Sequence, residues 1–155
     1  MAPFNGQVVV ITGASEGIGR ELALELAGQR PRLVLAARNV PRLEELAGAC
    51  RAAGAECLVV PTDVGVEADC ARLVRATLDR FGRLDVLVNN AGITMWSRLD
   101  ELRDPGVLER LVRVNYLGSA WLTRHALDAL QRSKGRIVAV ASVTGLTGVP
   151  TRSGY

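Results

Sequence analysis

A glycine-rich segment lies between an apolar strand and a helix, and it constrains this fold more than any other feature. Residues 7–11 are an apolar, β-branched run that predicts a strand, and residues 20–27 have helical periodicity ending at Gly28. Between them, residues 12–19 read Thr-Gly-Ala-Ser-Glu-Gly-Ile-Gly. A strand, a glycine turn and a helix in this order bring a helix N-terminus to a pyrophosphate, so the segment predicts a dinucleotide site.

Each of the three glycines has its own expected role. Gly13 lets the strand turn sharply, Gly17 lets the backbone approach the phosphates without a Cβ, and Gly19 lets the helix pack close to the strand. Ser15, Glu16 and Ile18, which lie between them, are expected to line the same site. The alternative is an ordinary glycine-rich turn, which the flanking strand and helix argue against.

The rest of the chain alternates between strands and helices without a linker or repeat. Strands are expected at residues 7–12, 33–37, 57–60, 84–88 and 136–141, and helices at residues 17–28, 39–53, 67–81 and 105–131. Asn39 is expected as the N-cap of the second helix and Gly82 as the stop of the third. The strands are continuous apolar runs, which indicates a parallel sheet covered on both faces. We therefore predict an α/β fold, a doubly wound parallel sheet of Rossmann type with strand order 3-2-1-4-5, in one domain spanning residues 1–155.

Composition excludes several classes of protein. The net charge of +3 comes from arginines scattered along helix faces, so no nucleic-acid partner is expected. No apolar stretch approaches the roughly 20 residues of a membrane span, and the N-terminus enters a strand without room for a signal peptide. The 3 cysteines form no metal-type pair and indicate reduced thiols. We expect a soluble, cytoplasmic protein without a metal site.

The motif Thr-Gly-x-x-x-Gly-Ile-Gly resembles that of the short-chain dehydrogenase/reductase family, in its compact one-domain branch. Further family motifs follow in order: Asp63 after the third strand, Asn89-Asn90-Ala91-Gly92 after the fourth, Asn115 in the long helix, Ser142 after the fifth strand, and Tyr155 at the family's usual distance from Ser142. The resemblance therefore covers the whole chain.

One departure from the family concerns the end of the chain. The family's catalytic tyrosine belongs to Tyr-x-x-x-Lys, whereas this sequence stops at Tyr155. Lys134 cannot substitute, because the strand between it and Ser142 spans roughly 26 Å at about 3.3 Å per residue. Without the family's later strands, the fifth strand would be an exposed apolar edge of the sheet. We therefore expect the natural protein to be longer, with those later strands, and the chain as given to be poorly active.

The end of the second strand predicts the cofactor. An acidic residue there would bind the ribose 2′-hydroxyl of NAD, but Ala37 and Arg38 occupy the position. A guanidinium can hold a 2′-phosphate through two charge-assisted bonds, and Ser15 could add a hydroxyl. The Glu16 carboxylate would repel phosphate unless it points away, and a solvated loop arginine is the alternative for Arg38. We predict NADP(H) as the preferred cofactor, with NAD(H) as the alternative.

The later motifs complete the expected cofactor site. Asp63, followed by Val64, would accept a hydrogen bond from the adenine amino group, although a turn-forming aspartate explains it equally well. Asn90, Ala91 and Gly92 place small residues where the backbone passes close to the cofactor's ribose. A simple turn at the end of the strand is the alternative for these three.

The resemblance also implies a catalytic set. Tyr155 would act as the acid/base and would also contact the cofactor, Ser142 would hold the reacting oxygen, and Asn115 would hold a water in a proton relay. His125, the sole histidine, is expected on a helix face or a subunit interface. Met95 and Trp96 fit a substrate wall or loop packing equally well.

We therefore predict an NADP(H)-dependent oxidoreductase that interconverts a secondary alcohol and a ketone or aldehyde. A catalytically silent dinucleotide-binding module is the alternative. An epimerase or dehydratase with bound NAD is a third reading, but such relatives usually carry T-G-x-x-G-x-x-G. Members of the family commonly pair their long helix across a two-fold axis, so a homodimer or homotetramer is expected, with Trp121, Leu122 and Leu127 as the apolar surface.

Overall fold

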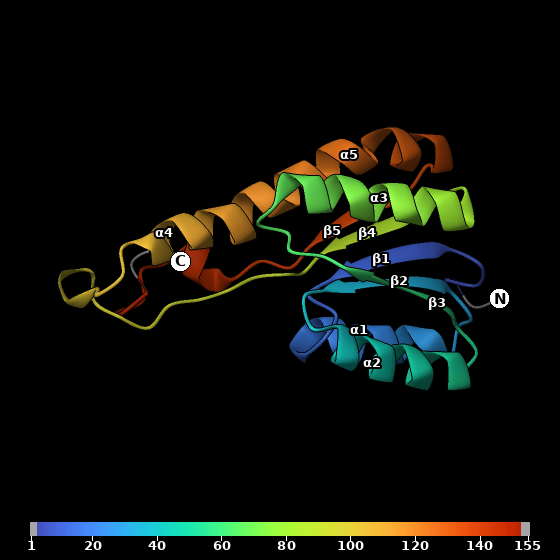
Figure 1. The fold of residues 1–155 in the computed structure, drawn as a ribbon, viewed down its shortest axis with the longest axis horizontal. Coiled ribbons are helices and arrows are strands. Elements are labelled where there is room, and N and C mark those ends of the chain that lie inside the picture. The colour runs from blue at the N-terminus through green and yellow to red at the C-terminus, as the bar shows by residue number, and fades with distance from the viewer. Residues whose placement is uncertain (1–2, 153–155) are drawn as a thin grey trace.

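The computed structural model describes residues 3–152, so Tyr155 lies outside the described residues. Within this range, five parallel strands form one sheet in the order β3-β2-β1-β4-β5, which confirms the predicted topology (Figure 1). The strands are β1 (Val8–Thr12), β2 (Arg32–Ala37), β3 (Glu56–Pro61), β4 (Val86–Asn89) and β5 (Arg136–Ala139).

Helices cover both faces of the sheet, as the continuous apolar strands predict. They are α1 (Gly17–Ala27), α2 (Val40–Ala52), α3 (Glu67–Phe81), α4 (Gly106–Leu111) and α5 (Gly118–Ser133). Figure 1 shows α1 and α2 on one face and α3 and α5 on the other. Side chains of β1 pack on both faces of the sheet. Val9 and Ile11 pack with α1 and α2, and Val8 and Val10 pack with α3 and α5. The fully buried β1 therefore lies at the centre of two apolar cores.

Several helix boundaries have identifiable causes. The Asn39 side chain accepts a hydrogen bond from the Arg42 backbone N–H at 3.2 Å, which confirms the predicted N-cap of α2. Helix α3 ends at Gly82, whose φ of 71° is the left-handed conformation that glycine adopts readily.

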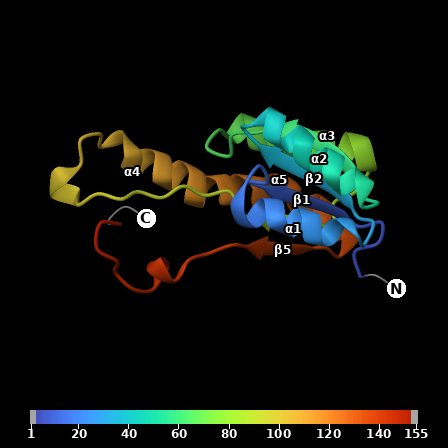
Figure 2. The ribbon, with the colours of Figure 1, turned by 90° about the horizontal axis from the view of Figure 1, so that it is seen from below.

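The predicted long helix at residues 105–131 is helical from Gly106 onward but not uniform. Between α4 and α5, residues Val112–Leu117 form a π-helix that contains Asn115. A π-helix inserts an extra residue into the helical turn and often occurs at functional sites. In Figure 2, α4 and the segment that follows β5 extend beyond the sheet on the same side. The π-helix thus lies where the helix leaves the sheet and enters this extension.

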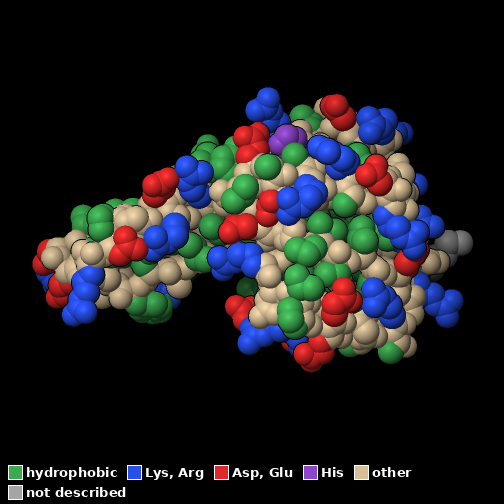
Figure 3. All heavy atoms as spheres, in the orientation of Figure 1, with side chains coloured by type: hydrophobic (Ala, Val, Ile, Leu, Met, Phe, Trp, Pro, Cys, Tyr) green, Lys and Arg blue, Asp and Glu red, His purple; other side chains and the backbone are tan. Residues whose placement is uncertain are grey.

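Strand β5 forms an exposed edge of the described sheet. Ile137 and Val138 are exposed, and so are Val143 and Leu146 in the segment beyond the strand. This is the apolar edge that the sequence predicts. On the face drawn in Figure 3, basic and acidic side chains are interspersed, as expected for solvated helix faces.

Residues 3–152 contain neither a membrane-spanning helix nor a metal-binding cluster. None of the helices in this range is both long and apolar enough to cross a membrane. The same residues contain no cluster of histidine, cysteine or acidic side chains that could hold a metal ion.

Candidate dinucleotide and catalytic site

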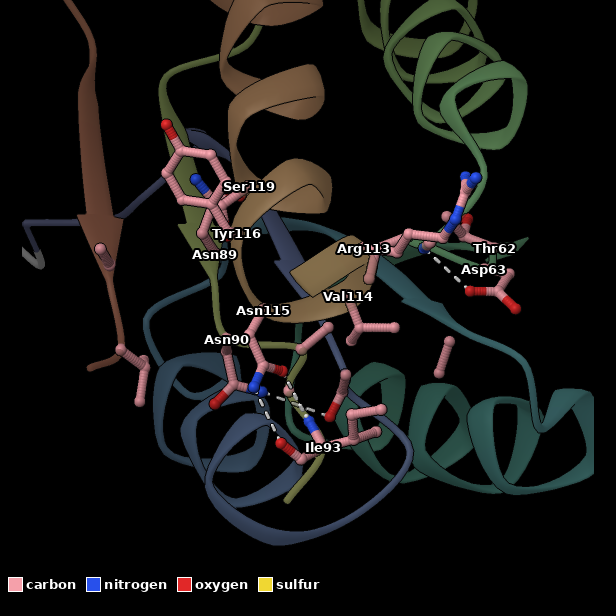
Figure 4. A pocket seen from close by; sticks show the side chains of 18 of the residues that line it. Thr62, Asp63, Asn89, Asn90, Ile93, Arg113, Val114, Asn115, Tyr116 and Ser119 are labelled. Atoms are coloured by element: carbon pink, nitrogen blue, oxygen red, sulfur yellow. Dashed lines mark hydrogen bonds between the residues drawn. The ribbon is translucent and has the colours of Figure 1, made fainter. Parts of the chain in front are cut away.

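A large cleft of about 1810 Å³ opens at the carboxyl ends of the strands. This is the position at which doubly wound sheets bind ligands. Its walls come from the glycine loop, the ends of β2 to β5 and the π-helix (Figure 4). The cleft brings together most of the predicted site residues, namely Gly13, Ser15, Glu16, Gly17, Ile18, Arg38, Asp63, Val64, Asn90, Ala91, Gly92, Asn115 and Ser142.

The three motif glycines meet three different steric demands. Gly13 has a φ of 64°, and a Cβ there would lie 2.9 Å from the Ala91 Cα. A Cβ at Gly19 would lie 2.6 Å from the Gly13 carbonyl oxygen, so close packing requires glycine at this position. Gly17 has a φ of 56°, but a Cβ there would meet no protein atom within 4 Å. Gly17 therefore borders open space in the cleft, and the loop has the form of a cradle that fits a pyrophosphate at the start of α1.

Thr12 connects the glycine loop to the end of β4. Its hydroxyl accepts hydrogen bonds from the backbone N–H groups of Asn90 and Ala91, both at 3.0 Å, and donates to the Val88 carbonyl at 3.1 Å. The Asn90 side chain returns a bond from Nδ2 to the Thr12 carbonyl at 2.8 Å. Thr12 directly precedes the first motif glycine, and this position is the sequence signal that could have predicted its role. The Asn90 side chain therefore links the ends of β1 and β4.

Asn115 holds the loop that follows Gly92. Its Oδ1 accepts a hydrogen bond from the Ile93 N–H and its Nδ2 donates to the Ile93 carbonyl, both at 2.9 Å (Figure 4). Both ends of the amide are thus engaged with the backbone of one residue. The structure assigns Asn115 a positioning role in the cleft wall, and its proposed contact with a relay water stays a prediction.

Replacing Asn115 with Leu should destabilise the full-length protein by about 1–3 kcal/mol, because it leaves the partly buried Ile93 amide groups without partners. Urea unfolding would measure the loss. Asn115→Asp keeps the acceptor for the Ile93 N–H and should lose less than Asn115→Leu. Equal unfolding free energies for wild type and Asn115→Leu would contradict the positioning role.

Asp63 forms the turn that the sequence analysis gave as the alternative to adenine binding. Its Oδ1 accepts a hydrogen bond from the Gly65 N–H at 2.9 Å, while the residue still lines the cleft. Val64 is buried, and its carbonyl oxygen would lie 2.7 Å from a Cβ at Gly118. Gly118, which the sequence analysis overlooked, therefore lets α5 pack closely against this turn. The adenine contact of Asp63 stays a prediction.

Arg38 directly follows β2, with its side chain exposed at the cleft. No carboxylate within residues 3–152 forms an ion pair with it. Glu16, the expected source of repulsion, forms an ion pair with Arg42 of α2. The cleft wall beside β2 therefore contains one free guanidinium and one carboxylate that is already paired.

Ser142 lies in an exposed segment beyond β5 and lines the cleft. Its hydroxyl oxygen accepts hydrogen bonds from the Thr144 hydroxyl at 2.8 Å and the Thr144 N–H at 3.2 Å. Lys134 ends α5 before β5 begins, so β5 separates it from Ser142 as expected. The predicted partner of Ser142, Tyr155, is outside the described residues.

His125, Met95 and Trp96 lie in different surroundings. The His125 Nε2 lies 3.5 Å from the Glu67 Oε1, which joins α5 to α3 and agrees with the predicted helix-face position. Met95 is buried, which favours loop packing, whereas Trp96 is exposed with the Arg152 guanidinium carbon 3.9 Å from its ring centroid.

The three cysteines are free thiols within the described chain. Cys50 and Cys70 are buried, and Cys57 is partly buried. Burial raises the pKa of the Cys70 thiol to about 11, which keeps it protonated at neutral pH. These features agree with cysteines that pack in the interior as reduced thiols.

Comparison with known proteins identifies the family. The family model of the short chain dehydrogenases matches residues 7–155, so the chain belongs to this family. Among curated relatives, it is 44% identical to the 11-beta-hydroxysteroid dehydrogenase-like 4A of Arabidopsis thaliana over 152 residues, which are 97% of this chain and 51% of that protein. It is also 44% identical to the 11-beta-hydroxysteroid dehydrogenase A of Sesamum indicum over 151 residues, covering 43% of that protein. The chain thus spans about half the length of these relatives.

Solved structures agree with this assignment. An alcohol dehydrogenase from the archaeon Thermococcus sibiricus, complexed with 5-hydroxy-NADP, is 35% identical with a TM-score of 0.93, and the match covers 97% of this chain and 64% of that one. A short chain dehydrogenase/reductase from Burkholderia phymatum in complex with NAD is 36% identical with a TM-score of 0.93, over 100% of this chain and 56% of that one. One of these relatives therefore binds a derivative of NADP, and the other binds NAD.

Proposed function

We propose that this chain carries the cofactor site of an NADP(H)-dependent oxidoreductase. The reaction would interconvert a secondary alcohol and a ketone or aldehyde. The observation that carries the proposal is the glycine cradle at the carboxyl end of the sheet, with Arg38 exposed beside it. The cradle fits a pyrophosphate, and the guanidinium suits a 2′-phosphate through paired charge-assisted bonds. The solved relatives include one complex with an NADP derivative and one with NAD, so the proposed preference depends on Arg38.

The bound nicotinamide would supply or accept the hydride. Residues of this chain would bind the substrate oxygen and transfer its proton. Ser142, which lines the cleft, would donate a hydrogen bond to that oxygen with its own O–H, while its oxygen accepts the bonds from Thr144. Tyr155 would transfer the proton, and Thr12, Asn90 and Asn115 would hold the cleft wall in shape.

Titration of the full-length protein with NADPH and NADH, followed by assays on a panel of carbonyl compounds and alcohols, tests this function. The panel should include 11-oxo and 11-hydroxy steroids, because the curated relatives have hydroxysteroid dehydrogenase names. We expect NADPH to bind more tightly and to reduce at least one ketone. Tight binding without turnover on any substrate would favour the silent dinucleotide-binding module instead.

We also propose that the full-length protein is a homodimer or homotetramer in which the outer face of α4, the π-helix and α5 is buried. Trp121 lines a shallow depression there, together with Leu108, Val112 and Leu117. Val112 is an exposed apolar side chain in this depression, whereas Leu127, which the sequence analysis also assigned to the surface, is exposed but lines the cleft. Leu122, which the sequence analysis assigned to this surface, is buried in the core at 1% exposure, because it faces the sheet.

Replacing Val112 with Glu should therefore shift the full-length protein toward the monomer in sedimentation velocity at micromolar concentration, because it places a charge in an apolar interface. Val40→Glu is the matched control, since Val40 is also exposed but lies on α2, across the sheet. A monomeric wild type, or an oligomer that Val112→Glu leaves intact, would refute this interface.

A further inference from the structure

We propose that Arg42 is a specificity-determining residue for the 2′-phosphate of NADP(H), and that it acts by neutralising Glu16 and by offering its remaining N–H groups to the phosphate. The inference rests on the proposed function. The sequence pattern alone presented Glu16 as an obstacle to phosphate binding. The ion pair changes that expectation, because the carboxylate is already paired with a cation.

The pair joins two elements at the mouth of the cleft. Glu16 directly precedes α1, and Arg42 belongs to the first turn of α2, 26 residues later in the sequence. The Arg42 Nη1 donates to the Glu16 Oε2. Both residues line the cleft, together with Ser15, Arg38 and Asn39. Arg42 therefore lies in the same wall as the predicted phosphate ligand, Arg38.

The start of α2 holds Arg42 in this wall. The Asn39 side chain caps the helix by accepting from the Arg42 backbone N–H at 3.2 Å. This bond determines where the first turn of α2 begins and from which point the Arg42 side chain extends. Asn39 follows Arg38 directly, so the cap also connects the two arginines through a short, ordered stretch of backbone.

Charge and donor number explain how Arg42 would act. Glu16, Arg38 and Arg42 together carry one net positive charge, and removal of Arg42 leaves them neutral. A guanidinium has five N–H donors, and the structure shows only Nη1 of Arg42 bonded to Glu16. Both side chains are more than half exposed, with 55% exposure for Arg42 and 73% for Glu16, so the guanidinium can accommodate a phosphate oxygen without breaking the pair.

This arrangement distinguishes the two cofactors. The 2′-phosphate of NADP(H) is an anion, which an unpaired Glu16 would repel and which Arg42 would attract. The 2′-hydroxyl of NAD(H) is neutral and is much less sensitive to either charge. Loss of Arg42 should therefore weaken the binding of one cofactor and leave the binding of the other nearly unchanged.

The test is a charge cycle on the full-length protein, with NADPH and NADH titrated separately. Arg42→Ala should raise the Kd for NADPH about tenfold, equivalent to about 1.4 kcal/mol, and change the Kd for NADH less than twofold. Adding Glu16→Gln to Arg42→Ala should restore part of the NADPH affinity, because the unpaired carboxylate is then removed while the lost N–H donors are not replaced. Arg20→Ala is the matched control: Arg20 pairs with Glu21 at 2.7 Å on α1 and does not line the cleft.

The outcomes separate this inference from the proposed function. If wild type binds neither nucleotide, the proposed function fails. If wild type prefers NADPH but Arg42→Ala leaves its Kd unchanged, the role of Arg42 is wrong while the function stands. Equal weakening of NADPH and NADH would also overturn the inference, because it indicates a structural role. So would a double variant whose NADPH affinity is no better than that of Arg42→Ala.

Discussion

Replacing Tyr155 with Phe should lower the turnover of the full-length protein by about 10²–10⁴-fold, which is the usual contribution of a positioned general acid. The substitution removes only the hydroxyl, so the ring can still pack and the Kd for NADPH should stay within a few-fold. Steady-state kinetics on an accepted ketone, paired with NADPH titration, would measure both quantities. A variant that keeps more than about a tenth of wild-type turnover would rule out proton transfer by this tyrosine.

Two further variants show which side chains are responsible for the loss of turnover. The sequence has 2 tyrosines, and the other, Tyr116, is exposed at the cleft, so Tyr116→Phe tests it as the alternative acid and should keep most of the activity. Ser142→Ala should also lower turnover strongly, by about 2–4 kcal/mol of transition-state stabilisation, as when a donor to the reacting oxygen is removed in comparable sites. A large loss of turnover in Tyr116→Phe, with little loss in Tyr155→Phe, would make Tyr116 the general acid in place of Tyr155.

Replacing Arg38 with Asp should reverse the cofactor preference. The change exchanges a cation for an anion next to the expected 2′-phosphate, whereas an acidic residue at the end of β2 can accept a bond from the 2′-hydroxyl of NAD(H). Charged hydrogen bonds contribute about 1.5–3 kcal/mol each, so the Kd for NADPH should rise on the order of a hundredfold or more. The Kd for NADH should stay the same or fall.

A conservative variant separates lost attraction from added repulsion at this position. Arg38→Gln removes the charge without introducing a carboxylate, so its Kd for NADPH should lie between those of wild type and Arg38→Asp. Titration of all three proteins with both nucleotides would show the order. Equal affinities of wild type for NADPH and NADH would contradict the assignment of Arg38.

The sequence by itself determined the sheet and the location of the site. Continuous apolar runs such as residues 7–12 predict buried parallel strands, and the strand order follows from general rules of handedness and of the switch point. Local signals were equally reliable where a residue acts on its own neighbours in the chain. Asn39 caps α2 and Gly82 ends α3, because capping depends on a few consecutive residues.

Only the tertiary structure decided which distant side chains meet in the cleft. The Asn115 amide binds the Ile93 backbone 22 residues away, and Glu16 pairs with Arg42 across two helices. Leu122 faces the core because it lies on the face of α5 that packs against α3 and the sheet. Such contacts depend on how the elements pack, whereas periodicity and motif spacing report only what lies within one turn, strand or helix.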